Sequence, residues 1–190
     1  MTGDLLLTLH AVRLLGFADA HAIADRFSRD HSLVESELID AGVLGFVSHT
    51  SFAGSSGWSL SSAGRVENER LLAAELDRED ARSLVMGVHN EFVDLNPTVV
   101  SACSAIQLQQ VRGMAASGIL EEVLASWSPL EERLAGSLPR FAGYSRRLMD
   151  ALERARRDSA WFTATDRDSF HRAWFELHED LIATLGIQRG

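Results

Sequence analysis

The sequence predicts a mainly α-helical chain with one small β-hairpin close to its N-terminal end. Apolar residues recur at helical spacing through most of the chain. Residues 43–60 instead alternate loosely around a glycine-rich centre, as two strands joined by a turn do. A charged stretch at residues 77–80 follows, and no convincing strand lies beyond it. We therefore expect two domains, residues 1–76 with the hairpin and residues 77–190 built only from helices.

The composition is that of an ordinary globular protein, with 46% hydrophobic and 24% charged residues among 190. The single cysteine, Cys103, excludes an intrachain disulfide and a zinc site made of several cysteines. No apolar run approaches the roughly 20 residues that span a bilayer. The first residues carry Asp4 where a signal peptide would be basic. We expect a cytoplasmic protein without a membrane partner.

Two short helices open the chain, at residues 4–17 and at residues 20–28, and Asp19 caps the second. Ser32-Leu-Val-Glu35 has the capping-box pattern, which predicts a third helix that begins near Leu33. Gly42 is expected to end this helix in a left-handed conformation.

The hairpin is expected to follow at once. Its first strand is predicted at Val43 to His49, its turn at residues 53–57 and its second strand at Trp58 to Leu60. Ser61 then caps a long helix. Three helices followed by such a hairpin have the order of a winged helix-turn-helix.

One run in this region resembles a known family. Gly57-Trp-Ser-Leu-Ser-Ser-Ala-Gly-Arg65 is similar to the Gly-Trp-x-Leu-Thr/Ser-x-x-Gly element that closes the wing of MarR-type bacterial regulators. Glu37-Leu-Ile-Asp-Ala-Gly-Val-Leu44 is similar to the segment that leaves their recognition helix. The resemblance covers roughly residues 5–75. It implies a winged helix that binds double-stranded DNA as a homodimer, in which Trp58 and Leu60 anchor the wing and Gly64 permits close packing.

In a winged helix the exposed face of the third helix enters the major groove and the wing contacts the backbone. The candidate DNA-binding residues are polar side chains on and around these two elements: Arg26, Arg29, His31, Ser32, Ser36, His49, Ser55, Ser56 and Arg65.

The charge of this region weakens the DNA hypothesis. The chain has a net charge of −9, and residues 1–76 contain five arginines and ten acidic residues. Phosphate contacts supply most of non-specific DNA affinity, so each monomer should bind weakly. The expected helix also lacks the Arg, Lys, Asn and Gln side chains that usually contact bases. Two hypotheses stay open: a dimeric transcriptional regulator, and a protein-interaction adaptor on a winged-helix scaffold.

Helices are expected throughout the C-terminal domain. Asn96-Pro97 is predicted to break one helix and to open another that ends near Gly113. Ser128-Pro-Leu-Glu131 resembles a second capping box, which starts a helix ending near Gly136. Further helices are expected at residues 119–127, at residues 139–157, and from after Asp166 to Leu185.

The same domain resembles helical effector or dimerisation domains of uncharacterised actinobacterial regulators. The residues that carry this resemblance are Phe92-x-x-Leu-Asn96, Pro139-Arg-Phe-x-x-Tyr144-x-x-Arg147-Leu148 and Ser169-Phe-His-x-x-Trp-Phe-Glu-Leu-His178-Glu-Asp-Leu181. The resemblance assigns no chemistry to them.

Two constellations in this domain could bind a ligand. An aromatic pocket for a small apolar effector could form from Trp161, His171, Trp174, Phe175 and His178. His171 and His178 lie about 10 Å apart along a helix, too far to share a metal ion, so no metal is expected, although Asp168 lies one turn before His171. The second constellation is a basic run that could bind an anion or form an ion-paired helix face: Arg140, Arg146, Arg147, Arg154, Arg156 and Arg157.

Nothing in the sequence predicts catalysis. Cys103 lies within an expected helix, where buried packing is its ordinary role. Phosphate-binding, dinucleotide-binding and zinc-protease motifs do not occur. We therefore expect neither an enzyme nor a cofactor.

Overall fold

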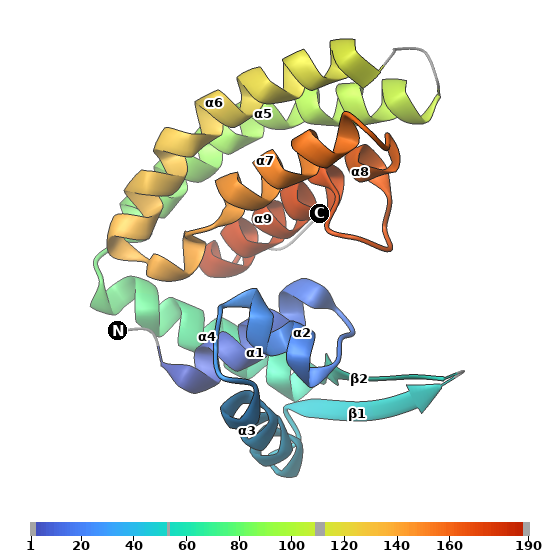
Figure 1. The fold of residues 1–190 in the computed structure, drawn as a ribbon. Helices are drawn as coiled ribbons and strands as arrows, with labels where there is room; N and C mark the ends of the chain where they lie inside the picture. The colour runs from blue at the N-terminus through green and yellow to red at the C-terminus, as the bar shows by residue number, and fades with distance from the viewer. Residues whose placement is uncertain (1–2, 53, 109–112, 188–190) are drawn as a thin grey trace. The chain divides into compact units, whose positions relative to one another are not determined.

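The computed structural model describes residues 3–52, 54–108 and 113–187. Within these ranges the protein is mainly α-helical with one two-stranded antiparallel sheet, which confirms the predicted mainly α class with a small β element (Figure 1). The chain divides into two compact units, Met1–Glu79 together with Ala183–Gly190, and Asp80–Ile182. The boundary expected at residue 76 lies three residues before the end of the first segment at Glu79. The C-terminal domain expected from the sequence also included residues 183–190, which are grouped here with the N-terminal unit.

The first two helices of the N-terminal unit form as their caps predict. Helix α1 (Asp4–Leu15) ends at Gly16, whose φ of 75° is in the left-handed region that glycine enters without strain. Helix α2 (Ala20–Arg26) begins after Asp19, whose carboxylate accepts a hydrogen bond from the Ala22 amide. Both helices turn apolar side chains into one small core.

Helix α3 (His31–Val43) begins earlier than the capping-box pattern predicts. The Asp30 carboxylate accepts hydrogen bonds from the amides of Ser32 and Leu33 and from the Ser32 hydroxyl. Asp30 is therefore the N-cap, and the prediction that Ser32 caps the helix was wrong. A carboxylate can accept all three hydrogen bonds at once, which a serine hydroxyl cannot do.

The predicted end of α3 was also wrong. Gly42 lies inside the helix, where an added Cβ would stand 3.5 Å from the Trp58 ring. The left-handed residue is Gly45, with a φ of 76°. A Cβ at that distance would make an ordinary van der Waals contact, so position 42 does not require glycine, and the turn falls three residues later.

The first strand of the hairpin lies further along the chain than predicted, and the second strand begins earlier than predicted. Strands β1 (Val47–Phe52) and β2 (Ser55–Leu60) pair antiparallel, from Val47 opposite Leu60 to Phe52 opposite Ser55. Of the predicted turn at residues 53–57, Ala53 lies outside the described residues, and Ser55 to Gly57 belong to β2. The β2 strand also forms a bridge with the α1–α2 loop, through hydrogen bonds between Trp58 and Ala18.

Ser61 caps helix α4 (Ser62–Arg78) by accepting a hydrogen bond from the Gly64 amide, as predicted. A Cβ on Gly64 would stand 1.9 Å from the Phe46 carbonyl oxygen, so only glycine fits there. The core beneath the hairpin is formed by apolar side chains from α1, α2, α3 and β1, among them Leu9, Val12, Ile23, Val34, Leu38 and Val47.

The C-terminal unit begins with two long helices, α5 (Arg82–Gln107) and α6 (Gly113–Ser137), which run side by side (Figure 1). Pro97 and Pro129 lie inside them, so the predicted breaks at both prolines were wrong. A proline inside a helix costs about 3 kcal/mol, whereas each large apolar side chain buried contributes about 1.5–3 kcal/mol. Several such side chains on these helices are buried, including Phe92, Val99, Leu120, Trp127 and Leu134. Burial therefore outweighs the local preference.

The rest of this unit is shorter helices around the same core. The helix predicted at residues 139–157 is divided into a 3-10 turn, η1 (Pro139–Phe141), and helix α7 (Tyr144–Ala155). Gly143, with a φ of 103°, separates the two. Helix α8 (Ala160–Thr163) precedes the last helix, α9 (Phe170–Leu185), which ends before Gly186 as predicted.

Candidate nucleic-acid interface

Helix α3 presents two opposite faces. Val34, Leu38 and Ala41 are buried in the core of the N-terminal unit. The outer face is exposed and carries the predicted groove residues His31, Ser32 and Ser36, together with Glu35 and Asp40. Three large apolar side chains share that surface, because Leu33, Ile39 and Val43 are 60%, 54% and 85% exposed. The exposed face is therefore neutral to acidic and partly apolar.

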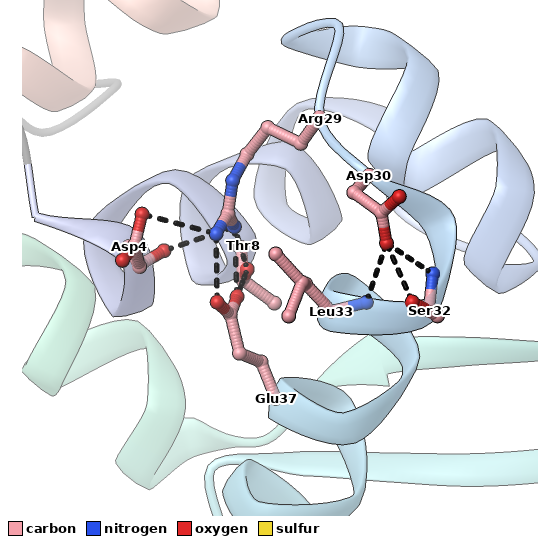
Figure 2. A network of polar contacts seen from close by, with 7 residues as sticks. All are labelled: Asp4, Thr8, Arg29, Asp30, Ser32, Leu33 and Glu37. Atoms are coloured by element: carbon pink, nitrogen blue, oxygen red, sulfur yellow. Dashed lines mark hydrogen bonds and ion pairs between the residues drawn. The ribbon is translucent and has the colours of Figure 1, made fainter.

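Arg29, a predicted DNA contact, lies instead within a network of polar side chains (Figure 2). Its guanidinium donates two hydrogen bonds to Glu37, each 2.7 Å long. It also donates to the Thr8 hydroxyl at 2.6 Å and forms an ion pair with Asp4 at 3.1 Å. Thr8 in turn donates to Glu37. The network joins α1, the α2–α3 turn and α3, so Arg29 positions the helix.

The electrostatics of this network match its geometry. The hydrogen bond with Glu37 is the main cause that raises the pKa of Arg29. Burial alone would raise the pKa of Glu37, but the hydrogen bonds from Arg29 and Thr8, with the charge of Arg29, hold that pKa below its ordinary value. Both groups are therefore charged at neutral pH. The sequence contains one indication of this network. Glu37 directly precedes Leu38 of the apolar face of the helix, and an acidic side chain that is partly buried beside such a residue needs a polar partner.

The other arginines of this unit are differently placed. Arg26 stacks its guanidinium over the Phe27 ring, 4.7 Å from the ring centroid. Arg13 and Arg70 pair with Glu69 and Glu67. Arg65 is exposed in the first turn of α4, and within the described part of the chain its side chain forms no ion pair or hydrogen bond. Of the three arginines predicted to contact DNA, Arg65 is thus the most accessible.

The hairpin holds the predicted wing residues in a chain of side-chain hydrogen bonds. The Ser56 hydroxyl lies 2.9 Å from Nε2 of His49 and 3.1 Å from the Ser51 hydroxyl. Ser55 is exposed beside Phe52, which is itself 85% exposed. His49 packs against the Trp58 ring at 4.8 Å between centroids. The hairpin therefore exposes hydroxyls, an imidazole and one phenyl ring.

One feature of the α2–α3 corner was missed from the sequence. His21 and His31 approach each other with their Nδ1 atoms 2.8 Å apart, and Nε2 of His31 lies 2.8 Å from a carboxylate oxygen of Asp25. The spacing of Asp25, four residues after His21, places both on one face of α2 and could have indicated a cluster. Two imidazole rings therefore lie at the N-terminal end of the exposed face of α3.

The five residues predicted to line an effector pocket lie in different surroundings. Trp174 is buried, stacks on Phe92 at 4.5 Å and donates a hydrogen bond from Nε1 to Asn96. His178 lies beside Phe92, and His171 is partly buried. Phe175 is 50% exposed. Trp161 instead packs against the guanidinium groups of Arg154 and Arg167. Trp174 thus belongs to the aromatic core of α5, α6 and α9.

Three arginines of the basic run in the C-terminal unit form ion pairs with carboxylates of the same unit. Arg140 is buried and pairs with Asp180. Arg147 pairs with Asp168 at 2.7 Å and with Glu176 at 2.8 Å. Arg156 pairs with Glu121 at the surface. These pairs support the ion-paired alternative for this helix, while Arg146, Arg154 and Arg157 are exposed.

Other kinds of site have little support in the described ranges. There, no group of three or more His, Cys, Asp and Glu side chains could hold a metal ion. Burial raises the pKa of Cys103 to about 11, so its thiol is protonated and a poor nucleophile at neutral pH. None of the helices described is both long enough and apolar enough to cross a membrane.

Comparison of the chain with protein-family models, with curated proteins and with solved structures finds no significant match.

Proposed function

We propose that the N-terminal unit is a winged helix-turn-helix that binds double-stranded DNA, and that the protein is a dimeric cytoplasmic transcriptional regulator. The observation that carries the proposal is the exposure of α3 beside a two-stranded hairpin. One face of α3 is packed on α1 and α2, and the side chains of its opposite face are exposed. In a winged helix, α3 is the recognition helix and the hairpin is the wing.

The Arg29 network supports this role by fixing α3. Hydrogen bonds and an ion pair join Arg29 to α1 and to Glu37 of α3. A recognition helix must hold its orientation if its side chains are to match the spacing of base edges. Arg29 therefore supports the contact surface from within, and we withdraw it as a phosphate ligand.

The contact surface that we propose is small. It consists of the helix residues His31, Ser32 and Ser36, the hairpin residues His49, Ser55 and Ser56, and the flanking Arg26 and Arg65. With few cations and several acids, one unit should bind weakly. Dimerisation through the C-terminal unit would pair two such surfaces about 34 Å apart, one turn of duplex. Two half-sites then compensate for the weak affinity of each.

Substitution of Ser36 by Glu tests the proposal. Ser36 lies at the centre of the exposed face of α3, so a carboxylate there would repel phosphate without disturbing the core. In a fluorescence-anisotropy titration at low salt, against duplex DNA from upstream of the protein's own gene, we expect the wild type to bind specifically. Ser36→Glu should lose at least about tenfold in affinity. The matched control is Ser101→Glu on the exposed side of α5, which should bind like the wild type. Equal binding by both variants would contradict the proposal.

A protein-interaction adaptor is the second candidate, and the apolar side chains on α3 favour it. Leu33, Ile39 and Val43 are large apolar side chains with more than half of their surface exposed, and neighbouring exposed apolar residues often mark a protein-interaction surface. If the outer face of α3 is buried between two protomers, sedimentation should show a dimer that Val43→Ser dissociates. That result, together with no DNA binding at low salt, would favour the adaptor over the regulator.

A further inference from the structure

His21 of α2 and His31 of α3 form a hydrogen-bonded pair across the helix-turn-helix corner. Their Nδ1 atoms are 2.8 Å apart and their ring centroids 4.4 Å apart, with the planes nearly perpendicular. Nε2 of His31 lies 2.8 Å from Oδ1 of Asp25. Because an ionised carboxylate only accepts, Nε2 of His31 carries a proton.

This arrangement limits the number of protons that the pair can hold. With a proton on Nε2, a neutral His31 has a bare Nδ1, so His21 donates through its own Nδ1–H. One further proton can bind to Nε2 of His21 and leave the contact intact. A second would place two N–H groups against each other at 2.8 Å, between two cationic rings. The doubly protonated pair must therefore separate.

The neighbouring charged groups are mostly acidic. Asp25 contacts His31 directly, and Asp30 precedes it at the N-cap of α3. The Asp30 pKa is lowered mainly by hydrogen bonds from Ser32 and Leu33, with a smaller contribution from the charge of His31. Glu35 lies one turn further along α3. These three carboxylates offset the unfavourable effect of the helix N-terminus on a cation there.

We infer that this histidine pair is a proton-sensitive contact that controls DNA binding, an inference that depends on the proposed function. Histidine is the side chain whose charge changes near neutral pH. Acidification first adds one positive charge at the corner and then opens the pair, which frees His31 at the edge of the recognition surface. Both steps make an acidic surface less repulsive to phosphate, so affinity for DNA rises as the pH falls.

The test measures binding of the full chain to its upstream duplex at about pH 7.5 and about pH 5.5, at one salt concentration. The wild type should bind about tenfold more tightly at the lower pH. His21→Gln removes the hydrogen-bond partner of His31 and leaves the side chains of the proposed DNA contacts unsubstituted, and it should reduce this dependence to about threefold or less. His89→Gln, on α5 in the C-terminal unit, is the matched control and should keep the full effect.

A second measurement requires no DNA. Long-range nitrogen–proton NMR spectra of the histidine rings should show the shared Nδ1 hydrogen bond at the higher pH and its loss at the lower pH. An unchanged pH dependence in His21→Gln, or a wild type without pH dependence, would overturn the inference while leaving DNA binding intact. If the chain binds no DNA at either pH, the proposed function fails. The NMR spectra then still test the histidine pair itself, because a His21–His31 hydrogen bond that persists at low pH refutes the opening of the pair.

Discussion

The two units both contain networks of arginine and carboxylate, but they place them at different depths. In the N-terminal unit, the side chains of Arg29 and Glu37 are 12% and 25% exposed, and Asp4 is mostly in solvent. In the C-terminal unit, Arg140 and Asp180 are fully buried, and Tyr144 donates a further hydrogen bond to Asp180 at 3.0 Å. Water can partly replace a lost partner at the edge of a domain, whereas in the core a lost partner leaves a bare charge. The same residue types therefore differ in their importance for stability.

The largest expected effect is that of Arg140→Met. This change removes the guanidinium that pairs with the buried carboxylate of Asp180, so the free energy of unfolding should fall by about 4 kcal/mol. Urea denaturation followed by tryptophan fluorescence measures it, because Trp127 and Trp174 lie in this core. Arg146→Met on the following helix, α7, is the exposed control and should change stability by less than about 0.5 kcal/mol. A loss below about 1 kcal/mol would mean that the buried pair is not needed.

Arg29→Ala should have a smaller effect and lower the free energy of unfolding by about 2 kcal/mol, because Glu37 loses its cation where water can reach it and keeps its hydrogen bond from Thr8. Hydrogen exchange resolved along the chain measures it. The amides of α1 and α3 should exchange faster in the variant, while those of α5 and α6 should not. Unchanged exchange throughout α3 would contradict a positioning role for Arg29.

The contacts of Glu37 also predict that the stability of the protein depends on pH. The folded-state pKa of Glu37 lies below its ordinary value of 4.5. Its contribution is therefore present above that value and is lost as the pH falls through the lower, folded-state pKa. The stability difference between the wild type and Glu37→Gln should be constant near neutral pH and shrink below about pH 4. A difference that stays constant in acid would show that Glu37 acts without its charge.

The sequence predicts those parts of the fold that local contacts determine. Asp19, Ser61 and Gly186 act at the helix ends where they were expected, because a cap needs only its own turn. Pro97 and Pro129 mislead, because the cost of proline in a helix is local while the burial that outweighs it comes from distant residues. Asp30 and Ser32 are both able to cap α3, and their order alone does not decide between them.

The candidate site is less predictable for the same reason. Arg29 and Arg65 are equivalent cations in the sequence, and only the folded chain separates one paired with Glu37 from one exposed on α4. His21 and His31 are ten residues apart on different helices, and their contact depends on the angle at which α2 meets α3. The pattern thus identifies the exposed elements but not which of their charges remain available.

The most direct test of the different roles of Arg29 and Arg65 is the salt dependence of DNA binding. We expect Arg65→Ala to reduce the slope of log K against log salt by about one, because one phosphate contact is lost. Arg29→Ala, compared at a temperature where it is folded, should leave the slope unchanged, since its guanidinium is held by Glu37. A reduced slope in Arg29→Ala with an unchanged slope in Arg65→Ala would contradict the account, because it would place the phosphate contact at the arginine that the fold uses internally.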